Sequence, residues 1–171
     1  MRILVTAASK HGGTAEMAEW IGERLQQEGL EAVVRAPDEV TSLDGFDAVV
    51  LGSGVYAGHW LQPARTFVDR LGRSLVARPV WIFSSGPVGD PLKPAEGPAD
   101  GETMRLATSA REHRLFAGRI DRSTMGFGEK AIMTALRVGD RDDRSRSEVE
   151  AWAAEIAAAV LAYGREPVLS R

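Results

Sequence analysis

The segment with the clearest capacity for chemistry lies near the N-terminus, directly after a short apolar run. It combines small residues, two glycines, two hydroxyls and two basic side chains in the sequence Ala7-Ala8-Ser9-Lys10-His11-Gly12-Gly13-Thr14. Glycines let backbone N–H groups approach a ligand, and a helix beginning here adds about half a positive charge at its N-terminus. We therefore interpret residues 9–14 as a phosphate-binding loop with Thr14 at the helix N-cap. The alternative is an ordinary strand-to-helix turn capped by threonine.

Two further segments offer exposed backbone beside flat or small side chains. One reads Gly52-Ser53-Gly54-Val55-Tyr56-Ala57-Gly58-His59-Trp60, and its composition suits a planar ligand. Tyr56 and Trp60 have the alternative of capping the hydrophobic core. The other reads Ser84-Ser85-Gly86-Pro87-Val88-Gly89, whose free N–H groups suit the polar edge of a flat ring.

These three segments must be positioned by regular elements. Apolar runs rich in β-branched residues predict strands at 2–7, 30–36, 47–52 and 79–84, and residues 113–120 are expected to form the fifth. Strands that alternate with helices form a parallel sheet covered on both faces, and such sheets bind ligands at the carboxyl ends of their strands. The three segments are therefore expected to meet at one edge of the sheet.

Helical spacing of apolar residues predicts helices at 14–28, 62–71 and 147–163. Gly29 and Gly72 are expected to end the first two, and Ser147 with Glu150 forms a candidate capping box for the third. Residues 125–138 show a weaker helical pattern, followed by a mixed-charge connection expected to be solvated. Residues 86–102 hold four prolines and four glycines, which predict a long loop.

Composition excludes several classes of protein. The 171 residues fit one domain, residues 1–171, and 44% apolar with 26% charged residues is ordinary for a globular chain. A net charge of −3 does not indicate the strongly basic surface that binds nucleic acid. Absence of cysteine excludes disulfides, thiol catalysis and iron–sulfur clusters, and three scattered histidines predict no metal site.

Known sequence motifs exclude several classes of protein that bind phosphate or carry out hydrolysis. The P-loop pattern and the nucleophile elbow of serine hydrolases are absent from the sequence. Gly52-Ser53-Gly54 begins a loose dinucleotide pattern, but the next predicted helix starts too far away to receive a pyrophosphate. A response regulator needs acidic residues after the first and third strands, where this chain has small ones.

With these residues in view, the chain resembles a flavodoxin-like FMN-binding domain, over about residues 1–163. The flavodoxin phosphate pattern [ST]-x-[ST]-G-x-T falls on residues 9–14, with His11 where a hydroxyl is usual. Within that superfamily it is most similar to the menaquinone-dependent protoporphyrinogen oxidase type. That type carries a Tyr-Gly-His run, matched here by Tyr56-Ala57-Gly58-His59, and a similar ending, matched by Gly139-Asp140-Arg141-Asp142 and Trp152-Ala153.

The resemblance implies an α/β three-layer sandwich with a five-stranded parallel sheet in the order 2-1-3-4-5. It implies FMN as the cofactor, with the flavin carrying the redox chemistry and no catalytic side chain required. The implied contacts are Ser9, Lys10, His11, Gly12, Gly13 and Thr14 around the phosphate, then Ser53, Gly54, Val55, Tyr56, Gly58 and His59, then Ser84, Ser85 and Gly86.

The sequence is compatible with two functions. One is an oxidoreductase that passes electrons between an organic donor, with protoporphyrinogen IX as the candidate, and a quinone. The other is an electron-transfer protein that docks to a redox-partner protein, although such shuttles are usually more acidic than this chain. We expect a cytoplasmic protein with at most peripheral contact at the inner face of the membrane. Met125, Phe127 and Met133 are expected to pack in the core, with the wall of a second-substrate site as the alternative.

Overall fold

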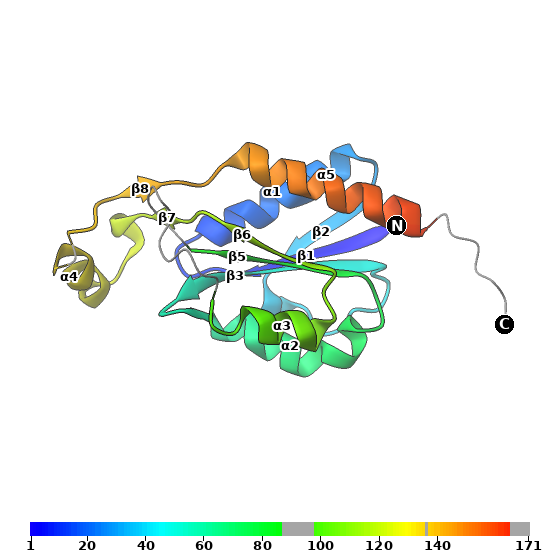
Figure 1. The fold of residues 1–171 in the computed structure, drawn as a ribbon, viewed down its shortest axis with the longest axis horizontal. Coiled ribbons are helices and arrows are strands. Elements are labelled where there is room, and N and C mark those ends of the chain that lie inside the picture. Colours follow the sequence, from blue (N-terminus) through cyan, green and yellow to red (C-terminus); the bar gives the residue numbers. More distant parts are fainter. Residues whose placement is uncertain (87–97, 136, 165–171) are drawn as a thin grey trace.

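The computed structural model describes residues 1–86, 98–135 and 137–164, and a parallel sheet lies at its centre (Figure 1). The order β2-β1-β3-β5-β6 of its parallel strands confirms the predicted 2-1-3-4-5 order. In that order the strands span Glu31–Arg35, Arg2–Ala8, Ala48–Tyr56, Val80–Ser85 and Glu112–Phe116. A further short strand, β4 (His59–Trp60), pairs antiparallel with the end of β3.

Helices cover both faces of the sheet, as predicted. Figure 1 shows α1 (Gly13–Gln27) and α5 (Arg146–Tyr163) on one face, and α2 (Gln62–Leu75) and α3 (Gly101–Thr108) on the other. Alternation along β1 sends Ile3 and Val5 into the core beneath α1 and α5, and Leu4 into the core above α2. Because both faces are covered, the central strands β1, β3 and β5 are buried along most of their length.

The helix ends differ from the predicted ones in three places. Helix α1 begins at Gly13 after a Gly12 N-cap, so the prediction of Thr14 as the cap is wrong. Helix α2 continues past Gly72 to Leu75, because Leu71 and Leu75 are both buried on one stripe and hold another turn against the sheet.

The N-terminus of α5 also differs from the predicted one. Ser145 is its N-cap, and the Oγ of Ser145 accepts a hydrogen bond from the backbone N–H of Glu148 at 3.3 Å. The predicted box of Ser147 and Glu150 is therefore wrong, and the helix starts one residue before position 147.

The proline- and glycine-rich segment ends in a helix that the sequence pattern did not predict. Residues 87–97 of the expected loop lie outside the described residues, but α3 begins at Gly101, within the predicted 86–102 range. The carboxylate of Asp100, at its N-cap, accepts hydrogen bonds from the backbone N–H of Trp60 at 3.1 Å. This contact fastens α3 beside the β3–β4 hairpin.

The predicted fifth strand, residues 113–120, divides in two. Strand β6 ends at Phe116, and β7 (Arg119–Ile120) pairs instead with β8 (Arg141–Asp142). Between them lie a short 3-10 helix, η2 (Arg122–Thr124), and α4 (Phe127–Ala135). We call residues 117–135 and 137–145 the arm; Figure 1 shows it projecting from the sandwich beyond one end of the sheet.

A short 3-10 helix, η1 (Pro37–Glu39), follows β2. Among the helices of the described residues, none is both long and apolar enough to cross a membrane.

Candidate functional site

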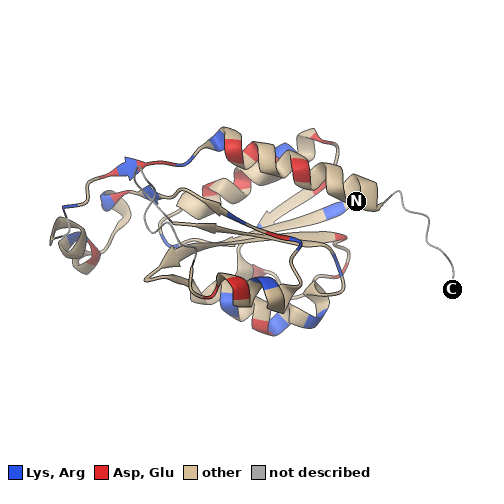
Figure 2. Cartoon of the chain, in the orientation of Figure 1, with Lys and Arg blue, Asp and Glu red and all other residues tan. Residues whose placement is uncertain are grey.

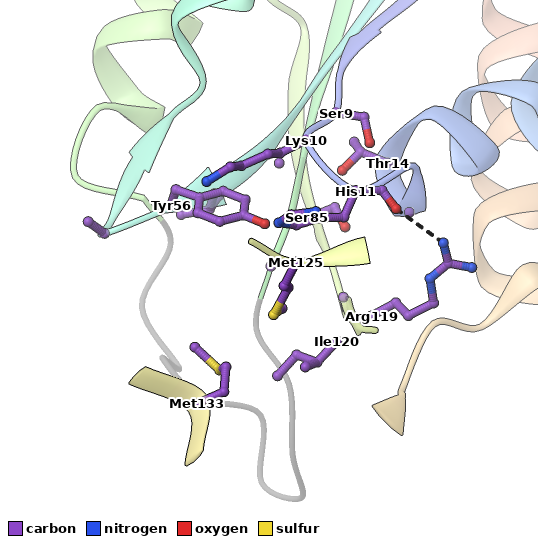
Figure 3. A pocket seen from close by; sticks show the side chains of 16 residues that line it. Ser9, Lys10, His11, Thr14, Tyr56, Ser85, Arg119, Ile120, Met125 and Met133 are labelled. Carbon is purple, nitrogen blue, oxygen red and sulfur yellow. Dashed lines mark hydrogen bonds between the residues drawn. The ribbon is translucent and has the colours of Figure 1, made fainter. Parts of the chain in front are cut away.

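A cavity of about 250 Å³ lies at the carboxyl ends of β1, β3 and β5, where the topology predicts ligand binding (Figure 3). Many of the predicted contacts line it: Ser9, Lys10, His11, Gly13, Thr14, Gly54, Val55, Tyr56, Ser85 and Gly86. The remaining lining residues are Ala57, Gly118, Arg119, Ile120, Met125 and Met133. Of these, the sequence indicated only the two methionines, as the alternative wall of a second-substrate site.

Residues 9–14, which we call the first loop, present the N-terminus of α1 to the cavity. Gly12 has a φ of 81°, a left-handed conformation that favours glycine, and it turns the chain into the helix. In the described part of the chain, no side chain caps this helix end. Its first amide groups can therefore satisfy their hydrogen bonds with an anion.

Thr14 lies in the first turn of α1, and its side chain faces β3. The residue is only 5% exposed, and a Cβ atom at Gly54 would lie 3.1 Å from the Oγ1 of Thr14. Glycine at position 54 therefore leaves this hydroxyl accessible from the cavity.

Tyr56 brings an aromatic ring from the end of β3 to the rim of the cavity. The Nζ of Lys10 lies 4.8 Å from the centre of this ring, and the imidazole of His11 lies 5.9 Å from it, centroid to centroid. Burial raises the pKa of Tyr56 to about 12, and the nearby negative charge of Glu129 adds to the rise. The phenol is therefore neutral at physiological pH.

Glu129 of α4 reaches the same loop from the arm. Its carboxylate accepts a hydrogen bond from the Nζ of Lys10 and lies 3.4 Å from the Nε2 of His11. The hydrogen bond from Lys10 lowers the pKa of Glu129 to about 2, with help from the backbone N–H of Gly126. An ionised carboxylate thus ties the arm to the first loop.

The arm also supplies an apolar wall, formed by Ile120, Met125 and Met133. In Figure 3 these three side chains lie across the cavity from Ser9 and Thr14. The expectation that Met125, Phe127 and Met133 pack in the core is wrong, because Met125 and Met133 are only half-buried and Phe127 is 92% exposed. Sequence spacing alone cannot separate this wall from a core stripe.

Several predicted contacts lie outside the cavity: Gly12, Ser53, Gly58, His59 and Ser84. Ser53 is fully buried, where its Oγ donates to the carbonyl of Gly54 at 2.8 Å and accepts from the backbone N–H of Leu61 at 2.9 Å. The His59 side chain is 57% exposed and lies 3.7 Å from Asp100. Gly58, at φ 80°, provides the turn of the hairpin.

Ser84 and Trp60 are core residues as well. The Nε1 of Trp60 donates to the Oγ of Ser84 at 2.7 Å, which settles the alternative for Trp60 in favour of the core. Ser85, the next residue along β5, lines the cavity, because successive side chains of a strand face opposite sides.

Close contacts around Gly86, directly after β5, shape the side of the cavity formed by the third predicted segment. A Cβ atom at Gly118 would lie 3.1 Å from the Cα of Gly86, and one at Gly86 would lie 3.0 Å from the Cβ of Val55. The remainder of this predicted segment, Pro87, Val88 and Gly89, lies outside the described residues.

The cavity as a whole fits the phosphate ester of a flat heterocycle. Helix amides and the hydroxyls of Ser9 and Thr14 suit a phosphate at one end. The ring of Tyr56, the backbone of Gly54 and Gly86, and the apolar wall suit a planar ring at the other.

Comparison with known proteins agrees with this geometry. A family model described as a flavodoxin domain matches residues 4–147. A solved flavodoxin from the domain Archaea is 19% identical, with a TM-score of 0.64 over 94% of this chain and 99% of that one. A cysteine-to-serine mutant of the flavodoxin from Pseudomonas aeruginosa is 17% identical, with the same TM-score and the same coverage.

Larger proteins contain the same fold. The rubredoxin oxygen:oxidoreductase from Desulfovibrio gigas is 12% identical, with a TM-score of 0.69 over 96% of this chain but only 37% of that one. At such identities the structural likeness establishes the fold, whereas the match of the family model over residues 4–147 establishes the family. The chain belongs to the flavodoxin domain family, and its cofactor is FMN.

Proposed function

We propose that this protein is an FMN-dependent oxidoreductase that passes electrons between an organic donor and a quinone-type acceptor. The observation that carries the proposal is the apolar wall of Ile120, Met125 and Met133, which lines the cavity. A protein that only exchanges electrons with protein partners does not need such a wall. A flat, apolar substrate does, because its burial supplies binding free energy.

FMN, when bound, supplies the redox chemistry by accepting electrons from one substrate and passing them to another. The residues of this chain hold and orient the reactants. Thioethers at positions 125 and 133 are flexible and polarisable, so they can pack against an aromatic or conjugated substrate of irregular outline. The neutral phenol of Tyr56 offers a second face and a hydrogen-bond donor at the rim.

We further propose protoporphyrinogen IX as the donor, on the resemblance of residues 56–59 to the Tyr-Gly-His run. A quinone acceptor dissolves in lipid, so the proposal includes a cytoplasmic protein with peripheral contact at the inner face of the membrane. The exposed side chains of Phe127 and Ile132 on α4 support that contact, since they lie on the same arm as the apolar wall.

The second candidate is a flavodoxin-type electron carrier for a redox-partner protein. It is favoured by Tyr56 at the rim of the cavity, which is 37% exposed. An open rim lets a partner protein approach the flavin. Against it stands the charge pattern: Figure 2 shows basic and acidic residues interspersed along the helices and the arm, and the net charge is −3. Such a surface steers a charged partner weakly.

An anaerobic assay separates the two candidates. FMN-loaded protein is mixed with protoporphyrinogen IX and a soluble quinone, and porphyrin fluorescence is followed against a control with free FMN. The proposal predicts a rise above that control, slowed in the double variant Met125→Ala/Met133→Ala. It predicts no slowing in Leu106→Ala, an exposed residue of α3 outside the cavity. No rise, together with rapid electron exchange with a carrier protein, would support the second candidate.

A further inference from the structure

Two carbonyl groups of the first loop are held by arginines of the arm. The Nη2 of Arg119 donates to the backbone carbonyl of His11 at 3.3 Å, a contact drawn in Figure 3. The Nη1 of Arg144 donates to the backbone carbonyl of Gly13 at 3.0 Å. Two arginines from different ends of the arm therefore hold alternate peptide units of one short loop.

Glu16 joins these two arginines. Its Oε2 accepts from the Nη1 of Arg119 at 3.1 Å and from the Nη1 of Arg144 at 2.6 Å. Asp142 binds the other side of Arg144 at 2.7 Å, and the ring of Trp20 lies 4.9 Å from its guanidinium carbon. The side chain of Arg144 is only 3% exposed, so its position is fixed on several sides.

The direction of these hydrogen bonds decides where the loop amides point. In a trans peptide the C=O and the following N–H point in opposite directions. The carbonyls of His11 and Gly13 point towards the arginines, so the N–H groups of Gly12 and Thr14 point away from them. Amide groups fixed in this way bind an anion without first having to reorient.

The two arginines and the two carboxylates that bind them form a cluster with no net charge. Arg119 and Arg144 carry two positive charges, and Glu16 and Asp142 carry two negative charges. Lys10, the other cation of the loop, is paired with Glu129. The cluster therefore offers a phosphate little net charge, and its effect must come from orienting the amides.

We propose that Arg119, Glu16 and Arg144 form a clamp that orients the amides of the first loop, and that this clamp makes the site selective for FMN over riboflavin. Each member is a positioning residue, since it acts through the backbone of residues 11–14. The inference depends on FMN binding at this loop and is independent of the identity of the electron donor and acceptor.

The clamp also gives the arm a second task. Arg119 lies on β7 and Arg144 lies just after β8, so the pairing of these two strands sets the spacing of the arginines. The segment that builds the apolar wall thereby orients the phosphate loop.

The test is a titration of the flavin-free protein with FMN and, separately, with riboflavin, followed by flavin fluorescence. Arg144→Gln is expected to weaken FMN binding about tenfold, the effect of losing one charge-assisted hydrogen bond between a loop amide and the phosphate. It is expected to leave riboflavin binding unchanged. The FMN affinity of Arg144→Lys should lie between those of the wild type and Arg144→Gln. Arg105→Gln, which breaks an exposed ion pair with Glu102 on α3, is the matched control and should alter neither affinity.

Glu16→Ala distinguishes orientation from simple charge, and its side chain is exposed enough that the fold should persist. Removing a negative charge beside a phosphate should tighten FMN binding if charge governs the site. The clamp predicts weaker FMN binding instead. Tighter binding in Glu16→Ala, or equal losses of FMN and riboflavin affinity in Arg144→Gln, would overturn the proposal.

A wild-type protein that binds neither flavin would overturn the clamp and the cofactor site together. An inactive donor assay would leave this titration unaffected, because no donor or acceptor takes part in it. The two failures can therefore be told apart.

Discussion

Trp60 and Ser84 meet inside the core, where the Nε1 of Trp60 donates to the Oγ of Ser84 at 2.7 Å. The two residues are 1% and 0% exposed. The same hydroxyl lies 2.8 Å from the Nε2 of His113, whose pKa is lowered by burial. This chain of contacts ties the β3–β4 hairpin to β5 and β6, so the two ligand-facing segments keep a fixed spacing.

Ser84→Ala should therefore affect stability rather than cofactor binding. The variant leaves the buried indole N–H of Trp60 without its partner, which costs about 1–3 kcal/mol of unfolding free energy. Urea unfolding measures the loss. Ser85→Ala, one residue along β5 and facing the cavity, is the control and should lose much less stability. Equal stability losses in the two variants would contradict the distinction.

Thr14→Ala should weaken FMN binding by about tenfold or more, because a hydrogen bond to a charged phosphate contributes about 1.5–3 kcal/mol. Thr14→Ser keeps the hydroxyl and should retain most of the affinity. Fluorescence titration of both variants with FMN measures the difference. If Thr14→Ala binds as tightly as the wild type, this hydroxyl has no part in the site.

Gly52→Ala and Gly72→Ala should change stability in opposite directions. A Cβ at position 52 would lie 2.1 Å from the Cζ of Phe83, and such overpacking costs about 1–3 kcal/mol or more. A Cβ at position 72 meets no atom of the described residues within 4 Å, and alanine within α2 should add about 0.5–1 kcal/mol. Thermal unfolding compares the two, and Phe83→Leu should partly rescue Gly52→Ala. Destabilisation of both variants alike would contradict this reading.

Tyr56 should ionise late in an alkaline titration. Its pKa in the folded protein is about 12, above the ordinary value of 10.0, because burial disfavours the phenolate. The folded state therefore holds this proton more tightly than the unfolded chain does. The resulting stabilisation is complete below about pH 10 and is lost as the pH rises towards 12.

Phenolate absorbance in a Tyr163→Phe background isolates Tyr56, since the chain has two tyrosines. The expected midpoint is about 12, and Glu129→Gln should lower it slightly by removing the smaller of the two causes. A midpoint near 10 in the folded protein would contradict this prediction, because partial burial and Glu129 would then not disfavour the phenolate.

The sheet and the first loop were predictable because their signals are local. Each buried strand is a short apolar run, and the first loop combines glycines with hydroxyls at the start of a helix. Both sets of features depend on residues that are neighbours in the sequence. The parallel order and most cavity-lining residues of the three segments followed from them.

The contribution of the arm was not predictable in this way. Arg144 contacts Gly13 across 131 positions, and in the sequence it stands within a mixed-charge run that resembles a solvated connection. Met125 and Met133 have the spacing of ordinary core residues. Ser53 and Ser84 failed as predicted contacts for a related reason, because a strand pattern alone does not say which face turns towards the ligand.

The roles given to the first loop depend on one contact, the binding of the FMN phosphate by the amides that begin α1. Amide NMR shifts of Gly12, Gly13 and Thr14 during titration with FMN, and then with riboflavin, report on this contact. We expect large shifts of these amide signals with FMN and much smaller ones with riboflavin, which lacks the phosphate. Equal shifts with both ligands, or shifts confined to residues of β3 and β5, would contradict it.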